Sequence, residues 1–374
     1  MSELILLTGA SGFLGSHIAL ELLRNGYRVR ALARGPKVDE LKALYAKYGD
    51  SVEVKGVTDI TTAEFPEAFD GVDAVIHSAA ALPQKEDADV MVRSAVDGTM
   101  NVARQTEQAG IKRLVVTSSI ATVINPSLPP PEMYTDQDWY PVADRQQALA
   151  SSKMDAYRAA KTIAEKELWA FGEAHPHLDI TTLNPPYLYG PFSPTFPLPP
   201  PGSYHALSTP LQLYRLLTPR GRFPPSAAYA DVRDVALCHV RALRAAPAPH
   251  PPSAARHPPE RRGKLGYAAA PSRQPPRKRV LLASPHPFDA AYVRALISVE
   301  FPDLEAQGRL TREVPPRYER DVMGVEWGRV EEVLGVGKEA CRRTEETVVD
   351  TVRSLLEVER RWREEGWEGP GEVI

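Results

Sequence analysis

The chain has 374 residues, of which 43 % are hydrophobic, and its formal net charge is −3. This length and apolar content are enough for one large domain, or two unequal ones, around a sizeable core. The small net charge gives no overall attraction to nucleic acid or to an anionic membrane, so we expect neither as a partner.

The cysteine content and the apolar runs indicate the compartment. Cys238 and Cys341 are the only cysteines, which argues against a disulfide framework and favours a reducing environment. Cys238 lies in an apolar helical pattern, and we expect it to pack in the core. No apolar run reaches the roughly 18 residues that span a bilayer. The N-terminal apolar run is too short for a signal peptide, so we predict a cytoplasmic protein.

Apolar strands and amphipathic helices alternate along the first half of the chain. Residues 4–8 form a predicted strand, residues 16–25 a helix that Gly26 ends, and residues 27–33 a second strand. The same pattern predicts strands over 51–55, 74–77, 114–117 and 180–184, and helices over 90–109 and 152–172. Strands separated by helices indicate a parallel sheet covered on both faces. We therefore predict an α/β protein with a Rossmann-type, doubly wound parallel sheet.

The second half of the chain predicts a smaller α+β region. The stretch "GPFSPTFPLPPPG" interrupts the alternation, because its prolines are incompatible with regular structure. We assign residues 1–184 to the larger domain, to which 226–245 return, and residues 185–225 and 280–374 to a C-terminal, substrate-binding region. The expected elements are helices within "DVRDVALCHVRAL", over 289–299 and over 339–364, and a strand over 280–283.

Residues 246–279 differ in composition from the rest of the chain. They contain nine prolines and one acidic residue, and Leu265 and Tyr267 are almost their only large apolar side chains. Such a segment cannot bury enough surface to offset its ordering entropy, so we predict an exposed, mobile insert. The alternative is a basic patch, formed by "PPRKR" and "ERRGK", for nucleic acid or nuclear import, although no aromatic residues or recognition fold accompany it.

The first strand leads into a glycine-rich turn, "TGASGFLGSHI". Gly9, Gly12 and Gly15 lie between a strand and a helix, where a missing Cβ lets backbone N–H groups approach a pyrophosphate. The spacing is G-x-x-G-x-x-G, and its strand-turn-helix setting favours a dinucleotide cradle over a tight turn that binds nothing. We assign Phe13 and Leu14, in the same turn, to the cofactor site.

The residues after the second strand indicate which dinucleotide binds. An acidic residue there would bind the ribose of NAD, whereas Ala33 and Arg34 leave room and positive charge for a 2′-phosphate. We therefore predict NADP (NADPH), with Arg34 and Lys37 as phosphate contacts or, alternatively, as ordinary surface charges. Further cofactor contacts are predicted at Asp59, which could instead cap a turn, and at Ala79 and Ala80.

Ser119, Tyr157 and Lys161 are the candidate catalytic residues. Tyr157 and Lys161 are four residues apart, which places the phenol and the ammonium on one helical face. We expect the cation to lower the pKa of the phenol, so that Tyr157 protonates an alkoxide while the Ser119 hydroxyl binds the same oxygen. The alternative is a helix whose tyrosine packs and whose lysine is solvated. No residue is assigned to a metal.

Seven motifs in order resemble the extended short-chain dehydrogenase/reductases, in the branch of dihydroflavonol reductases, cinnamoyl-CoA reductases and fungal aldehyde/ketone reductases. They are "TGASGFLGSHI", "VDAVIHSAA", "AVDGTMNV", "RLVVTSS", "YRAAKTIAEKELWAF", "LNPPYLYGP" and "DVRDVALCHVRAL". The resemblance implies that Ser119, rather than Ser118, acts with Tyr157 and Lys161. It also implies that Lys161 binds the nicotinamide ribose and that Pro185 to Leu188 line the cofactor and substrate cleft. Chains of this branch have a shorter connecting segment in place of residues 246–276.

The resemblance leaves several functions open. We predict an NADPH-dependent reductase of an aldehyde or ketone, with a small carbonyl substrate, as a monomer or homodimer. The alternatives are a nucleotide-sugar epimerase or dehydratase that retains NAD, a steroid dehydrogenase-like enzyme, and a non-catalytic dinucleotide sensor. Ala33 and Arg34 argue against the epimerase, and the intact Tyr157 and Lys161 argue against the sensor.

The loops expected to line the substrate pocket contain large side chains. These loops cover residues 81–84, 120–140 and 192–217. Their apolar and aromatic residues suit an apolar or aromatic carbonyl compound, although each could instead be ordinary packing: Met133, Trp139, Tyr140, Phe192, Phe196 and Tyr204.

Overall fold

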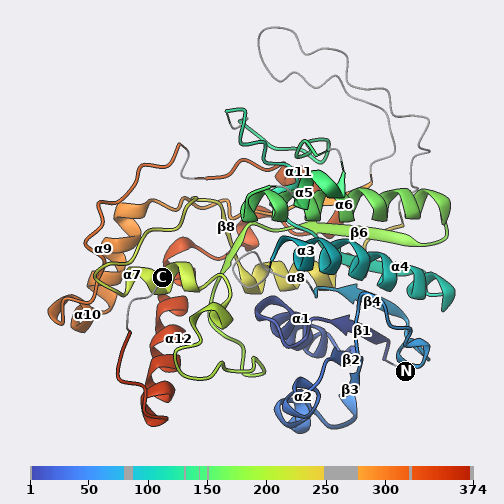
Figure 1. Cartoon of the computed structure of the whole chain (residues 1–374), viewed down its shortest axis with the longest axis horizontal. Coiled ribbons are helices and arrows are strands. Elements are labelled where there is room, and N and C mark those ends of the chain that lie inside the picture. The colour runs from blue at the N-terminus through green and yellow to red at the C-terminus, as the bar shows by residue number, and fades with distance from the viewer. Residues whose placement is uncertain are drawn as a thin grey trace, which may run out of the picture.

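The computed structural model describes residues 2–79, 87–129, 132–142, 144–149, 151–247, 277–319 and 322–370. Its centre is a parallel sheet of seven strands in the order β3-β2-β1-β4-β5-β6-β9 (Figure 1). The strands are β1 (Leu4–Thr8), β2 (Arg28–Ala33), β3 (Val52–Gly56), β4 (Ala74–His77), β5 (Arg113–Thr117), β6 (Asp179–Asn184) and β9 (Lys278–Leu281). The predicted doubly wound α/β fold is confirmed. The strand order reverses between β1 and β4, where ligands of this architecture bind.

Helices cover both faces of this sheet. Alternate residues of β1 point to opposite sides, so Ile5 and Leu7 belong to one core cluster and Leu4 and Leu6 to another. The first cluster packs beneath α1 (Phe13–Arg24), α2 (Lys37–Tyr45), α8 (Val232–Ala242) and α11 (Trp327–Leu334). The second packs against α4 (Gly98–Gln108) and α6 (Lys153–Ala174). Cys238 is buried in the first cluster, as expected.

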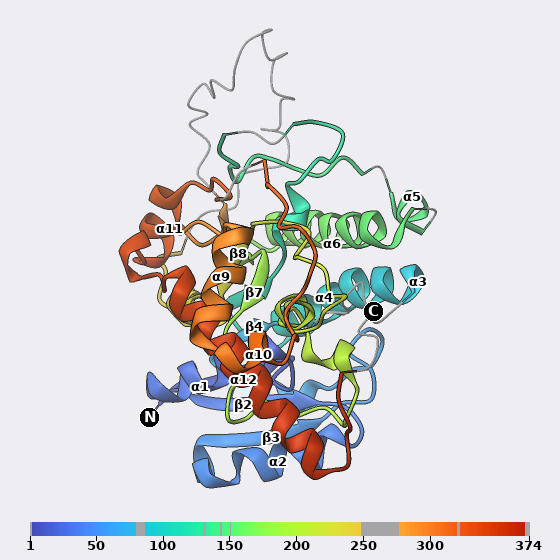
Figure 2. The same cartoon turned by 90° about the vertical axis from the view of Figure 1, so that its left-hand side faces the viewer.

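A smaller region with its own apolar cluster adjoins the sheet. It contains a two-stranded parallel sheet and four helices, which Figure 1 shows gathered on one side of the molecule and Figure 2 shows from that side. These elements are β7 (Tyr187–Tyr189), β8 (Tyr229–Asp231), α7 (Leu211–Leu216), α9 (Ala290–Glu300), α10 (Pro302–Ala306) and α12 (Thr344–Glu364). Their core is formed by large side chains, among them Tyr214, Phe288 and Trp362. In the described part of the chain, no helix combines the length and the apolar character needed to cross a bilayer.

Some helix boundaries differ from the prediction. The helix expected over 90–109 is divided into α3 (Ala88–Val92), a π-helical turn (Arg93–Asp97) and α4. The C-terminal helix begins at Thr344 instead of 339. The preceding residues form a 3₁₀ turn (Lys338–Ala340), and the Arg342 amide donates a 2.8 Å hydrogen bond to Asp234. These departures depend on tertiary contacts that local periodicity does not report.

Five short helices were not predicted at all: α2, α7, α10, α11 and the helix over Arg145–Leu149. Two of them bury very few side chains. Helix α2 buries only Leu41 and Tyr45, so its apolar pattern is weak. Helix α5 (Arg145–Leu149) buries only Ala148. Neither segment carries the repeated apolar positions by which an amphipathic helix is identified in a sequence.

The prediction for residues 246–279 is wrong at its C-terminal end. Residues 248–276 lie outside the described residues, but Lys278 and Arg279 belong to β9, which pairs with β6. Their side chains are 3 % and 1 % exposed, and they form ion pairs with Asp179 at 2.5 Å and with Glu165 at 2.7 Å.

The pairing of β9 with β6 also changes the boundary of the larger domain. The ion pairs exclude part of the proposed basic patch. Strand β9 belongs to the main sheet, so residues 278–281 lie in the larger domain. Arg277 pairs with Glu173 in the same way as its two neighbours pair with acidic residues. The charges of "RKR" are therefore neutralised inside the fold and are not displayed to a nucleic acid.

Candidate active site

The glycine-rich turn between β1 and α1 is closely packed against the end of β4. Gly9 has φ +78°, and a Cβ there would lie 2.7 Å from the Ala79 amide nitrogen. At Gly15, a Cβ would lie 2.0 Å from the Gly9 carbonyl oxygen. The turn is closed by a 2.8 Å hydrogen bond from the Gly12 amide to the Gly9 carbonyl. Any side chain at Gly9 or Gly15 would displace this backbone.

The same turn fits a pyrophosphate. Helix α1 begins at Phe13, directly after Gly12, and no side chain caps its N-terminus. The first amide groups of a helix have no partner within the helix and carry a partial positive charge, so they bind anions. The turn therefore has the donors and the close backbone approach that a dinucleotide needs.

The residues predicted around the adenosine end follow strands β2 and β3. Arg34 and Lys37 are exposed. The Asp59 carboxylate accepts 2.8 Å hydrogen bonds from the amide and the hydroxyl of Thr61. These bonds, together with the nearby Arg34, lower the pKa of Asp59. The structure thus places Asp59 in the turn-capping role that was the alternative to an adenine contact.

The remaining predicted cofactor residues have mixed surroundings. Phe13 and Leu14 are buried, and the Phe13 ring packs edge to face against Phe192 at 5.5 Å. The Ala79 amide donates to the Thr8 hydroxyl at 3.2 Å. Ala80 lies outside the described residues, as do residues 81–84 of the expected pocket loops. Pro185 and Leu188 lie in the segment that follows β6, and both are buried.

The structure brings the three candidate catalytic residues together. Ser119 follows β5 and precedes a single 3₁₀ turn (Ile120–Thr122), while Tyr157 and Lys161 lie one turn apart on α6. The Tyr157 phenol lies close enough to the Ser119 side chain for Ser119 to lower its pKa. The Lys161 ammonium donates to the Thr117 carbonyl at 3.3 Å. Two hydroxyl groups and one cation therefore meet where β5 ends.

The pKa of Tyr157 differs from the prediction. Burial raises it, the nearby Ser119 side chain opposes this rise, and the neighbouring Tyr187 adds to it. Burial also lowers the pKa of the Lys161 ammonium to about 8, against the opposing effect of Glu165. The expected lowering of the phenol pKa by Lys161 is thus wrong for this structure, because desolvation dominates both groups.

The neighbouring Ser118 faces a different partner. Its hydroxyl donates a 2.5 Å hydrogen bond to the buried Glu165 carboxylate. Ser119 is therefore the serine of the pair that contacts Tyr157.

A comparison with protein families agrees with this geometry. Residues 5–253 match the NAD dependent epimerase/dehydratase family, which is more than half of the chain. The chain belongs to this family. An uncharacterized oxidoreductase of Schizosaccharomyces pombe is 35 % identical over 255 residues, which cover 64 % of this chain and 74 % of that protein. The ketoreductase sphI of Aspergillus fumigatus is 35 % identical over 198 residues, which cover 50 % of this chain and 59 % of that protein.

Solved structures show the same fold. Yeast methylglyoxal/isovaleraldehyde reductase Gre2, complexed with NADPH, aligns with a TM-score of 0.71 and 21 % identity. The alignment covers 96 % of this chain and 99 % of that one. The smaller C-terminal region is therefore part of the shared architecture and is not an addition to it.

In this family member, most of the predicted pocket side chains pack against other groups. Trp139 lies 3.7 Å beneath the Arg279 guanidinium, and Tyr204 packs edge to face on Trp362. Phe192 and Phe196 stack on each other at 4.8 Å. Tyr140 lies near Asp155 and lowers the pKa of its carboxyl, and Met133 is 48 % exposed. These contacts favour ordinary packing for Trp139, Tyr204 and the two phenylalanines.

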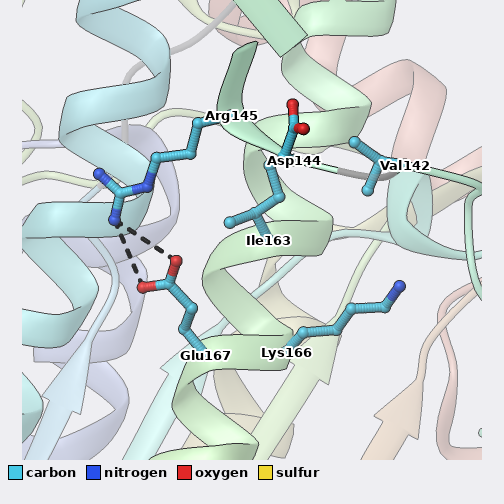
Figure 3. Close-up of a pocket in the computed structure, with 6 residues that line it drawn as sticks. All are labelled: Val142, Asp144, Arg145, Ile163, Lys166 and Glu167. Carbon is cyan, nitrogen blue, oxygen red and sulfur yellow. Dashed lines mark hydrogen bonds and ion pairs between the residues drawn. The ribbon is translucent and has the colours of Figure 1, made fainter. Parts of the chain in front are cut away.

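A cavity of about 330 Å³ lies between α5 and α6 but does not contain the candidate catalytic residues (Figure 3). Its lining consists of Val142, Asp144, Arg145, Ile163, Lys166 and Glu167, and Figure 3 shows Arg145 reaching across to Glu167. Since neither Tyr157 nor Ser119 lines it, we do not assign the substrate to this cavity.

Sequence reasoning missed Glu165 and Arg279 beside the site, and it placed Tyr187 in the cleft segment Pro185 to Leu188 without a role of its own. Glu165 lies one helical turn after Lys161, and that spacing was a signal that could have been used. Tyr187 affects the pKa of Tyr157 and follows β6 in "LNPPYLYGP". Arg279 had no such signal, because its partners are distant in the sequence.

Proposed function

We propose that this protein is an NADPH-dependent reductase that converts an aldehyde or ketone into an alcohol. The observation that carries the proposal is that Ser119 and Tyr157 lie close together where β5 ends, with Lys161 one turn from Tyr157 on α6. The names of the relatives, an oxidoreductase and a ketoreductase, support the same reaction class.

The chain's own residues supply the proton and hold the substrate oxygen. When bound, NADPH supplies a hydride to the carbonyl carbon. The hydroxyls of Ser119 and Tyr157 donate hydrogen bonds to the carbonyl oxygen as negative charge develops on it. Tyr157 then transfers its proton to that oxygen, which leaves as the alcohol. Lys161 favours the phenolate that remains, because an ammonium nearby stabilises a negative charge.

The raised pKa of Tyr157 is compatible with this direction of reaction. A proton donor must hold its proton at the start of the cycle, and a phenol whose pKa lies above 10.0 does so at neutral pH. An alkoxide is a stronger base than a phenolate, so the transfer is favourable. The opposite reaction, oxidation of an alcohol, needs the phenolate as base and is disfavoured by the same burial.

We propose NADPH rather than NADH because of the charges that follow β2. Ala33 ends the strand, Arg34 and Lys37 are exposed, and no acidic side chain stands at that position. A guanidinium binds a phosphate through charge-assisted hydrogen bonds, whereas the ribose hydroxyls of NADH offer it no anion. A nucleotide-sugar epimerase would instead retain NAD, and analysis of the nucleotide released on denaturing the purified protein separates the two.

The proposal is tested by a panel of aldehydes, ketones and β-keto esters assayed for NADPH consumption. Substrate-dependent oxidation of NADPH by the wild-type protein supports a reductase. No turnover across the panel, together with tightly bound NAD in the purified protein, would favour the epimerase. We propose a small carbonyl compound as the substrate.

A further inference from the structure

The ion pair of Arg279 and Glu165 lies inside the protein, close to the candidate catalytic residues. The side chains are each 1 % exposed, and the Arg279 Nε lies 2.7 Å from the Glu165 carboxylate. Arg279 comes from β9, the edge strand of the main sheet, and Glu165 from α6. The pair therefore joins strand β9 to the helix that carries Tyr157 and Lys161.

Arg279 uses the rest of its guanidinium to hold the loop that follows the serine turn. One terminal nitrogen donates to the carbonyls of Asp136 and Asp138 at 2.8 and 2.7 Å. The other donates to the Thr122 hydroxyl at 2.9 Å. The plane of the guanidinium stacks on Trp139. Only a planar fork of donors can satisfy these directions at once, which a lysine cannot do.

Glu165 holds the strand ends on the other side of the pair. Its carboxylate accepts hydrogen bonds from Ser118 at 2.5 Å, from Asn184 at 2.7 Å and from Thr182 at 3.1 Å. Ser118 follows β5, and the other two residues belong to β6. One carboxylate therefore fixes the ends of two adjacent strands to α6.

The network ends on the backbone of Ser119. The Thr122 hydroxyl, which accepts from Arg279, donates to the Ser119 carbonyl at 2.8 Å. The Asn184 amide donates to the Thr122 hydroxyl at 3.0 Å and to the Ser119 carbonyl at 3.3 Å. The Ser119 carbonyl therefore accepts hydrogen bonds from Thr122 and Asn184. Arg279 is bonded to this Thr122, and Glu165 to this Asn184.

We propose that Arg279 and Glu165 are positioning residues, which place the Ser119 hydroxyl against Tyr157. This inference rests on the proposed function, since it names residues that act through the proposed catalytic groups. It assigns a role in turnover to a side chain of β9 that acts through Thr122 and Glu165.

Two features distinguish this arrangement from a purely structural ion pair. A buried ion pair contributes little net stability, because desolvation offsets the attraction, yet here both groups also make hydrogen bonds that converge on one loop. Glu165 also lies one turn from Lys161 and favours its ammonium. Among the described residues, the Thr117 carbonyl on β5, His77 on β4 and Tyr157 on the same helix also lie near Lys161. Burial lowers the pKa of His77 to about 3, so this neighbour is neutral.

The first test is Arg279→Lys, which keeps the charge but loses the fork. We expect kcat to fall at least about tenfold, because small displacements of reacting groups have large effects on rate. The dissociation constant of NADPH, measured by fluorescence, should change by less than about twofold, since the cradle is built from other elements. The matched control is Lys278→Met, which breaks the neighbouring buried ion pair with Asp179 on the opposite face of β9.

The control separates stability from positioning. Lys278→Met should lower the melting temperature but keep kcat within about twofold of the wild type. A value of kcat in Arg279→Lys that equals that of Lys278→Met would overturn the proposal. A loss of kcat in Arg279→Lys alone, at a temperature where both variants are folded, supports it.

A double variant keeps the test valid if Arg279→Lys does not fold. Glu165→Gln/Arg279→Met removes both charges together and leaves no unpaired charge in the core. We expect a low kcat and an alkaline limb of the pH profile of kcat that moves to lower pH, because Lys161 has lost its carboxylate. Wild-type kcat with an unshifted profile would overturn the proposal, since a merely structural pair predicts that result.

Failure of the proposed function gives a different pattern. A wild-type protein that reduces no carbonyl substrate counts against the reductase and leaves the geometry to be tested by crystallography. A crystal structure of Arg279→Lys should then show Ser119 and Thr122 displaced from Tyr157. An unchanged position of the Ser119 hydroxyl relative to Tyr157 in that structure would overturn the positioning role.

Discussion

Replacing Arg279 with methionine should produce a large, pH-dependent loss of stability. The substitution leaves the Glu165 carboxylate, 1 % exposed, with hydrogen bonds from Ser118, Asn184 and Thr182 but without its cation. Removing one partner of a buried ion pair costs about 3–5 kcal/mol. We expect the free energy of unfolding at about pH 8 to fall by that amount, measured by urea denaturation.

The sign of the pH dependence follows from the pKa of Glu165. In the wild type, burial raises this pKa, but Arg279 and the hydrogen bonds outweigh burial and hold it below 4.5. The stability contributed by Glu165 is then present above the unfolded pKa and is lost as the pH falls through the lower folded value. Without Arg279, burial prevails and the folded pKa rises. The variant therefore loses stability as the pH rises from the unfolded pKa of Glu165 to its raised folded pKa. Its loss of unfolding free energy relative to the wild type should be smaller at about pH 5 than at about pH 8.

A second substitution provides the control. Adding Glu165→Gln removes the unpaired charge, and the double variant should regain most of the lost stability. A loss below about 1 kcal/mol in Arg279→Met, or a deficit that is the same at both pH values, would refute the reasoning about this ion pair.

Three further predictions concern the cofactor and the lysine. Arg34→Ala should remove much of a preference for NADPH over NADH, at a cost of about 1.5–3 kcal/mol in NADPH binding, and unchanged discrimination would transfer the role to Lys37 or another residue. Gly15→Ala places a Cβ 2.0 Å from the Gly9 carbonyl oxygen, so the dissociation constant of NADPH should rise at least about tenfold; wild-type affinity by titration would mean that the turn does not hold the pyrophosphate. The pH profile of kcat for reduction should fall above about pH 8, where Lys161 loses its proton, and a flat profile to higher pH would show that the ammonium is not required.

Much of the fold could be predicted from the sequence because its determinants are local. The apolar runs of β1, β4 and β6 and the long amphipathic helix α6 are each complete within a short window, and the order of strands and helices indicates a parallel sheet. The glycine spacing and the Tyr157 and Lys161 pair are local in the same way. Family membership was predicted from these motifs and is confirmed by the family match.

What could not be predicted depends on contacts between distant segments. Arg279 and Glu165 are 114 positions apart in the sequence, and a basic run read alone indicates a solvated surface. The raised pKa of Tyr157 likewise depends on burial by surrounding elements, which a helical spacing does not report. Helix α2 was missed because so few of its residues are buried.

The most direct test of the proposed function compares wild type, Tyr157→Phe and Tyr189→Phe for NADPH consumption with the best carbonyl substrate of the panel. Tyr189 is a matched control, because its buried hydroxyl makes no hydrogen bond in the described part of the chain. We predict that Tyr157→Phe lowers kcat at least about a hundredfold while NADPH still binds, and that Tyr189→Phe retains turnover. Near-normal turnover in folded Tyr157→Phe would contradict the assignment of Tyr157 as the proton donor.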